Sequence, residues 1–159
     1  MRKQKKKYDM PLKPWDKTRI DSEKKLAQDY GLRRKSEIWK MQSVLRNYRR
    51  IARGLAANTD KEREKILLDK LFKIGLVGSD ANLDDVLALT IEKLLDRRLQ
   101  TIVFKKGISN TIKQSRQMIV HGHIAVDGRK TKWPSAIIPL ADEGKISVYM
   151  GSKMNGGKQ

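Results

Sequence analysis

The large and uneven positive charge of this chain is the feature that most restricts what it can fold into. The net charge is +18, from 36 Lys and Arg against 18 acidic residues. Residues 1–58 carry a net charge of +12 and residues 100–159 of +7, whereas residues 59–99 are nearly neutral at −1. A compact chain with so much like charge repels itself unless a polyanion neutralises it. Nucleic acid and an anionic membrane surface are the two candidate partners.

What the sequence lacks excludes several classes of protein. No apolar run approaches the roughly 18 residues of a membrane span, and no apolar stretch of a signal peptide follows the basic N-terminus. The chain has no cysteine, which excludes disulfides, cysteine-ligated zinc and a thiol nucleophile. We therefore expect a soluble cytoplasmic protein that does not associate with a membrane.

Residues 1–20 are expected to form a basic, extended arm. The opening MRKQKKK holds five basic side chains and no apolar anchor except Met1, which is typical of segments that are disordered alone. Pro11 and Pro14 prevent a regular helix. Trp15 is interpreted as a packing anchor rather than a platform for base stacking. The arm is expected to become ordered only against a polyanion.

Residues 21–96 are predicted to be a helical region, beginning with two helices. Asp21 or Ser22 caps a short helix that ends at Gly31. Ser36 is the expected N-cap of a long helix, because apolar residues then recur at alternating spacings of three and four. The members of this stripe are Ile38, Met41, Leu45, Tyr48, Ala52 and Leu55.

Two more helices are predicted in the nearly neutral middle of the chain. Thr59 and Glu62 have the spacing of a capping box, and the helix that they open ends at Gly75. A further helix is expected over residues 83–106, with a break near Thr90.

A row of arginines lies beside the apolar stripe of the long helix: Arg46, Arg49, Arg50 and Arg53. None of them has an acidic residue three or four positions away, the spacing at which helical ion pairs form. Such a row contacts either water or phosphates, and the planar guanidinium group of arginine matches the geometry of phosphate. We interpret the row, and the basic triplet Arg33, Arg34 and Lys35 before it, as phosphate-binding.

The C-terminal part is predicted to form a helix followed by short strands. The helix is expected to start at Asn110 or Thr111 and to run to about Val120, with Thr111 and Gln114 at capping-box spacing. A strand over residues 124–126 then leads into a tight hairpin turn made by Asp127 and Gly128.

The remaining residues are expected to form two further short strands, over residues 137–140 and 146–148, around a turn. Residues 151–159 are expected to be a flexible tail.

His121 and His123 are the only histidines, and both would point to the same side of a strand. A zinc or copper site needs a third and usually a fourth donor, which Asp127 alone does not supply. The sequence has no nucleophile elbow, Walker loop or dinucleotide-binding fingerprint, and the acidic pair Asp84 and Asp85 is explained by a helix N-terminus. We predict no enzyme activity, no cofactor and no metal site.

The histidines, on the turn expected after the helix, instead fit a surface of phosphate donors. Lys113, Arg116 and Gln117 lie on one face of the predicted helix, and backbone amides at its start can bind an oxyanion. The hairpin turn would hold Arg129 and Lys130 away from the sheet edge. The alternative is a basic face that only keeps the protein soluble.

Two stretches resemble the small RNA-binding module named after ribosomal protein S-four: RRLQTIVFKKG at residues 97–107 and SRQMIVHGHIAVDGR at residues 115–129. That module packs two helices on a short antiparallel sheet. The upstream stretches YDMP, PWDKTRID and YGLRRKSEIW resemble the archaeal and eukaryotic branch of the S-four family of ribosomal proteins. The resemblance spans roughly residues 2–150, so it covers the whole ribosomal protein and implies an α+β fold with the module at residues 97–150.

The resemblance also implies a function. S-four proteins are primary binders of small-subunit ribosomal RNA at a multi-helix junction, where they nucleate assembly of the subunit body. The family implies contacts with other small-subunit proteins, including the S-five protein, an effect on translational accuracy, and a position near the path by which messenger RNA enters. Many bacterial relatives carry an N-terminal cysteine cluster for zinc, which this sequence lacks, so packing and RNA must hold its N-terminal part.

The residues expected to contact RNA combine the basic segments with the module's matching positions. They are Arg33, Arg34, Lys35, Arg46, Arg49, Arg50, Arg53, Arg98, Lys105, Lys106, Thr111, Lys113, Arg116, Gln117, His121, His123, Arg129 and Lys130. We expect recognition by shape, in which cations on a stiff scaffold match the phosphates of folded RNA.

Three alternative functions remain open from the sequence. A stress-response factor that recycles stalled ribosomes would share the module. An RNA-modifying enzyme such as a pseudouridine synthase would need a separate catalytic domain. Charge alone would also allow a DNA-compacting protein.

Overall fold

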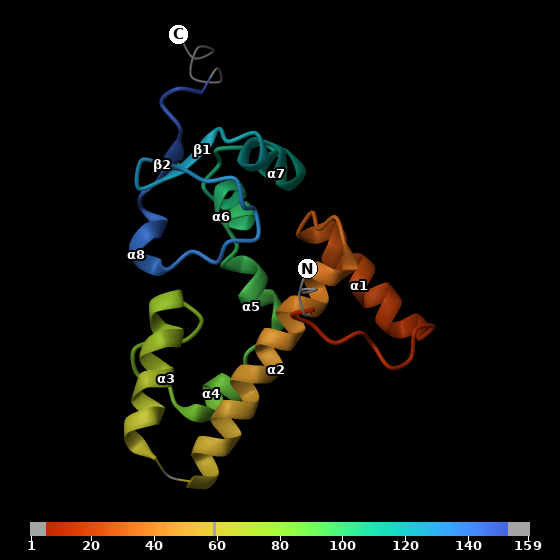
Figure 1. The fold of residues 1–159 in the computed structure, drawn as a ribbon, viewed down its shortest axis with the longest axis vertical. Coiled ribbons are helices and arrows are strands. Elements are labelled where there is room, and N and C mark those ends of the chain that lie inside the picture. The colour runs from red at the N-terminus through yellow and green to blue at the C-terminus, as the bar shows by residue number, and fades with distance from the viewer. Residues whose placement is uncertain (1–5, 59, 153–159) are drawn as a thin grey trace, which may run out of the picture.

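A computed structural model describes residues 6–58 and 60–152, and it has the predicted α+β fold (Figure 1). Within those residues, no helix is long and apolar enough to cross a membrane. The elements, in chain order, are α1 (Lys17–Asp29), α2 (Lys35–Asn58), α3 (Lys61–Ile74), α4 (Leu83–Leu87), α5 (Ile91–Asp96), α6 (Leu99–Lys105), α7 (Ile112–Val120), β1 (Ile124–Val126), β2 (Arg129–Lys130), α8 (Leu140–Glu143) and β3 (Ile146–Val148).

The long helix α2 connects the parts of the molecule (Figure 1). Helix α1 folds back beside the first turns of α2, while α3 and α4 lie beside its C-terminal half. Helix α5 leads from there to α6, α7 and the sheet, which form the opposite end of the molecule.

Helix α1 begins before the predicted cap at Asp21 or Ser22. The Asp16 carboxylate accepts the backbone N–H of Thr18 at 3.1 Å and the Thr18 hydroxyl at 2.7 Å, so Asp16 is the N-cap. A carboxylate in this position satisfies amides that have no partner within the helix. The end of the helix just before Gly31 is as predicted.

Helices α2 to α5 enclose the first of two apolar cores. The predicted stripe of α2 contributes Leu45 and Ala52, and the other buried members are Leu67, Leu71, Leu76, Val86, Leu89 and Leu94. Helix α3 ends at Gly75 as predicted, with the glycine in the left-handed region at φ 80°. Thr59, the first residue of the predicted capping box, lies outside the described residues, and Asp60 is the N-cap.

The predicted helix over residues 83–106 is divided into α4, α5 and α6. The break near Thr90 is confirmed, but a second break at Arg97 and Arg98 was not predicted. Arg98 has extended backbone angles and makes an isolated β-bridge with Ile137, while the N–H of Leu99 donates to the carbonyl of Ala136 at 2.8 Å. Pairing with a distant segment therefore interrupts a helix that the local sequence would continue.

The second core lies between α6, α7 and the sheet, whose strand order is β2-β1-β3 with antiparallel pairs. Its buried members are Leu99, Ile102, Val103, Met118, Ile119, Ile124, Ile138 and Ile146. The hairpin turn is confirmed, because Val126 pairs with Arg129 and both Asp127 and Gly128 have positive φ, at 52° and 72°. This is the pattern of a two-residue type I′ turn.

Helix α7 begins with the predicted cap. The Thr111 hydroxyl accepts the N–H of Gln114 at 3.1 Å, but the Gln114 side chain accepts the N–H of Asn110 rather than that of Thr111.

Two expectations about other segments are wrong. Residues 137–140 do not form a strand: Ile137 makes a single bridge, and Leu140 begins α8 after Pro139, which has no N–H for a ladder. Trp15 does not pack, since it is 90% exposed. Most of the expected tail, residues 153–159, and residues 1–5 of the expected arm lie outside the described residues, whereas Ser152 is buried.

The first core gives a test of the packing. Replacing Leu71, which is 0% exposed, with Ala should lower the free energy of unfolding by about 2–5 kcal/mol because it leaves a cavity. Ile66 lies on the same helix but is 68% exposed, so Ile66→Ala should change it by no more than about 1 kcal/mol. Urea unfolding of both variants measures the difference, and equal losses would contradict the assigned core.

Candidate RNA-binding surface

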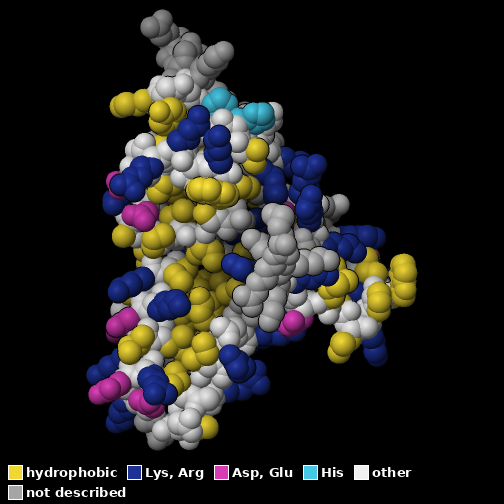
Figure 2. Space-filling model, in the orientation of Figure 1, with side chains coloured by type: hydrophobic (Ala, Val, Ile, Leu, Met, Phe, Trp, Pro, Cys, Tyr) yellow, Lys and Arg dark blue, Asp and Glu magenta, His cyan; other side chains and the backbone are white. Residues whose placement is uncertain are grey.

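Basic side chains are spread over much of the face that Figure 2 shows, with fewer acidic ones among them. The two histidines lie together at the end that holds the sheet. Apolar side chains are exposed in the hollow between the basic regions in this view. Exposed cations therefore occur both on the helical part and on the module of α6, α7 and β1 to β3.

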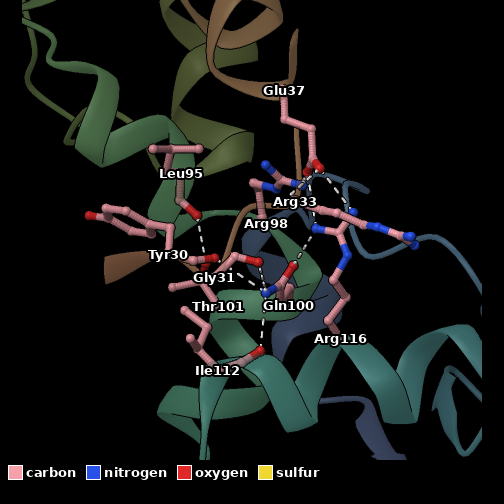
Figure 3. Close-up of polar contacts among 10 residues, drawn as sticks. All are labelled: Tyr30, Gly31, Arg33, Glu37, Leu95, Arg98, Gln100, Thr101, Ile112 and Arg116. Carbon is pink, nitrogen blue, oxygen red and sulfur yellow. Dashed lines mark hydrogen bonds and ion pairs between the residues drawn. The ribbon is translucent and has the colours of Figure 1, made fainter. Parts of the chain in front are cut away.

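A buried ion-pair network joins the start of α2 to this module (Figure 3). The Glu37 carboxylate on α2 accepts Nη2–H of Arg98 at 2.5 Å and Nη2–H of Arg116 at 2.9 Å. Nη1–H of Arg116 also donates to Glu37, at 3.2 Å, so Arg116 forms a two-pronged pair. One carboxylate thus holds arginines from the start of α6 and from α7.

Gln100, on α6, continues the same network (Figure 3). Its side-chain NH₂ group donates to the carbonyls of Gly31 at 3.2 Å and Ile112 at 3.1 Å. Its side-chain carbonyl accepts a 3.4 Å bond from Arg116. The amide is buried, so these bonds tie the α1–α2 connection to both helices of the module.

The two arginines keep Glu37 ionised. Burial raises the pKa of Glu37, but hydrogen bonds from Arg116 and Arg98 and their positive charges outweigh it and lower the pKa from 4.5 to about 2. The carboxylate is therefore a permanent negative charge at neutral pH, in a region that is otherwise strongly positive.

Arg98 lies inside the protein, not on the exposed surface where it was expected. It is 1% exposed and paired with Glu37. Arg116 is half-buried and shares that pair. Both arginines therefore have an intramolecular role, whatever either residue contributes to RNA contact.

The arginine row of α2 divides into one partly buried and three exposed residues. Arg49 donates to the carbonyl of Leu89 at 2.6 Å, which helps to hold α2 against the segment before α5. Arg46, Arg50 and Arg53 are exposed. Arg46 approaches Asp9 at 3.9 Å, an acidic partner from outside the helix that local spacing did not indicate. The triplet Arg33, Arg34 and Lys35 is also exposed.

Three of the predicted residues near the module are held by internal contacts. Lys105 pairs with Asp96 at 3.0 Å, the Lys106 ammonium donates to the carbonyl of Glu143, and Thr111 is the cap of α7. These three residues are nevertheless exposed, and the other exposed candidates of the module are Lys113, Gln117, His121, Arg129 and Lys130. Lys130 also lies over the Tyr149 ring, 5.5 Å from its centre.

The histidines lie in the expected connection between α7 and β1, and not on a strand. His121 is the C-cap of α7, and His123 precedes β1. Their rings nevertheless stack with centres 6.2 Å apart, and Nδ1 of His123 is 2.7 Å from the Ser152 hydroxyl. Among the described residues, no group of three or more His, Cys, Asp or Glu could hold a metal ion.

The comparisons with known proteins fit this geometry. A family model described as S4 domain matches residues 97–143. The chain is 48% identical to small ribosomal subunit protein uS4 of Methanothermobacter thermautotrophicus, over 96% of this chain and 91% of that protein. It is 50% identical to uS4 of Methanococcus aeolicus, over 92% and 85% of the two chains. It is also 49% identical to uS4 of Saccharolobus solfataricus, over 95% and 86%.

The chain belongs to the uS4 family.

The key residues that sequence reasoning missed in this uS4 protein are Glu37 and Gln100. Glu37 follows the expected N-cap Ser36, and its partners lie 61 and 79 residues further along the chain. No local spacing indicates such pairs. Gln100 lies in the stretch that resembles the module, but that stretch does not say what the amide contacts.

The Glu37 network predicts a dependence of stability on pH. A carboxyl group whose pKa is lower in the folded state stabilises the fold above its unfolded pKa, near 4.5, and loses this contribution as the pH falls towards 2. Glu37→Gln should therefore cost about 3 kcal/mol at pH 7, because Arg98 is left buried and unpaired. It should also flatten the loss of stability below pH 4.5. Urea unfolding from pH 7 to pH 3 tests this, and parallel curves for both proteins would contradict it.

Proposed function

We propose that this chain is a structural protein of the small ribosomal subunit and that it binds ribosomal RNA. The observation that carries the proposal is the similarity to small ribosomal subunit protein uS4 over 96% of the chain. An enzyme that had borrowed the module would share only the module. The proposed role is therefore structural and not enzymatic, and its proposed place is the small subunit of the cytoplasmic ribosome.

The binding surface that we propose has two parts. On the module it comprises Lys113, Gln117, His121, Arg129 and Lys130. On the helical part it comprises the triplet at residues 33–35 with Arg46, Arg50 and Arg53. These side chains are exposed, and within the described residues no ion pair engages Lys113, Arg129 or Arg53. Their positive charge would displace counterions from RNA phosphates.

A rigid frame makes this surface selective for shape. The network of Glu37, Arg98, Gln100 and Arg116 fixes the module relative to α2. Cations held at fixed separations contact many phosphates at once only where the RNA presents them in a matching arrangement. This supports binding at a junction of several RNA helices rather than along one regular helix.

Other parts of the proposal rest on the family resemblance. They are nucleation of subunit-body assembly, contact with the S-five protein, an influence on translational accuracy and a position near the incoming messenger RNA. Co-sedimentation in stoichiometric amount with small subunits through a high-salt wash tests the ribosomal role. Release by the wash, or association only with stalled ribosomes, would favour a recycling factor instead.

Salt dependence tests the module surface. Lys113→Gln should weaken binding to a folded small-subunit RNA fragment several-fold and should reduce the slope of log affinity against log salt by about 0.7–0.9, because one phosphate contact is lost. Lys65→Gln removes the same charge from an exposed position on α3 and should leave affinity and slope unchanged. Filter binding over a range of salt concentrations measures both, and equal slopes for the two variants would contradict the assigned surface.

A further inference from the structure

A pocket of about 450 Å³ lies between α2 and the module. Arg33 and Arg34 line it from the α1–α2 connection, Lys40 from α2, and Arg98 and Arg116 from the module. Its volume is within the range of about 300–1,000 Å³ that is usual for small-ligand sites.

The charge in this pocket is strongly unbalanced. Of the described residues that line it, five are Lys or Arg, and the only acidic one is Glu37. Glu37 pairs with Arg98 and Arg116, whereas none of the ion pairs among the described residues involves Arg33, Arg34 or Lys40. Cations gathered around one hollow repel one another unless an anion enters it.

Arg98 is a second, independent observation, because part of its charge is unpaired beneath the pocket. It is 1% exposed, yet its Nε and Nη1 atoms are buried without a hydrogen-bond partner in the described part of the chain. Unpaired buried donors of a charged group are costly and uncommon. One carboxylate is therefore not enough to satisfy the arginines here.

We infer that this pocket binds one phosphate group, which comes from the backbone of the bound RNA. This inference rests on the proposed RNA-binding function, but it assigns a discrete site in place of a diffuse basic face. Lys40, Arg33 and Arg34 would donate to the phosphate oxygens, and the buried charge of Arg98 would attract the anion from beneath. Guanidinium forks suit phosphate geometry.

Glu37 has a distinct role in this site. In the free protein its carboxylate occupies the fork of Arg116 (Figure 3), so it acts as a built-in anion that holds the two parts together before RNA arrives. A phosphate entering the pocket shares Arg116 with it and is repelled by its charge. Glu37 therefore stabilises the free fold and weakens phosphate binding.

Inorganic phosphate is the simplest probe of the pocket. The full chain labelled with ¹⁵N is titrated with sodium phosphate against sodium chloride at the same ionic strength. We expect saturable shifts of the Nε–H signals of Arg34 and Arg116, with none at Arg50 or Arg129, which lie outside the pocket. No difference from chloride, or equal shifts at all four arginines, would overturn the site as an adventitious effect of charge.

Two variants extend the test to RNA. Lys40→Gln should reduce both phosphate and RNA affinity several-fold without loss of stability, while the matched control Lys65→Gln changes none of the three. Glu37→Gln should raise phosphate affinity several-fold although it lowers stability, and a purely structural glutamate would not raise it. If Glu37→Gln does not fold, the phosphate and RNA affinities of Lys40→Gln decide whether the proposed site stands.

The outcomes separate this inference from the proposed function. If Lys113→Gln weakens RNA binding but Lys40→Gln does not, and phosphate causes no specific shift, the pocket is refuted while RNA binding stands. If phosphate binds specifically but Lys40→Gln leaves RNA affinity unchanged, RNA is refuted as the source of the phosphate. If wild-type protein binds unstructured RNA as tightly as the folded fragment, the proposed function itself fails.

Discussion

The ion pair that Glu37 makes with two arginines is the interaction on which the arrangement of this protein depends. The Glu37 side chain is 14% exposed, and that of Arg98 is 1% exposed. Removing such charges from water is costly unless each is paired. The pairing is satisfied only when the start of α2 lies against both α6 and α7. The same charges therefore fix the relative position of two parts that have separate apolar cores.

Because the two parts have separate apolar cores, polar contacts between them fix their relative position. The first core is built by α2 to α5 and the second by α6, α7 and the sheet. Between the helical part and the module the contacts include the bonds of Gln100 to the carbonyls of Tyr30 and Gly31, and the pairs of Glu37 with the two arginines. Hydrogen bonds and ion pairs require particular distances and angles, so they define orientation more narrowly than apolar contact does. The proposed recognition of RNA by shape requires such a defined orientation.

Local signals predicted much of the fold. The apolar stripe of α2, the cap of α7 at Thr111 and the type I′ turn at Asp127 and Gly128 each depend on residues within a few positions of one another. The errors arose where distant segments meet. The helix predicted over residues 83–106 is interrupted at Arg98, because its backbone pairs with Ile137. The strand predicted at residues 137–140 gives way to α8 beyond that single bridge.

For the candidate RNA-binding surface too, some features follow from the local sequence and others from contacts between distant residues. Composition and spacing by themselves determined that the chain is strongly basic at both ends and that its cations gather on helix faces. The resemblance to a ribosomal RNA-binding family came from particular stretches of the sequence. Only the tertiary structure decided which cations are available: Lys113 and Arg129 remain exposed, whereas Arg98 is buried and Arg116 is shared with Glu37. The physical reason is that charge is a property of each residue, but its exposure and its partners depend on contacts between residues far apart in the chain.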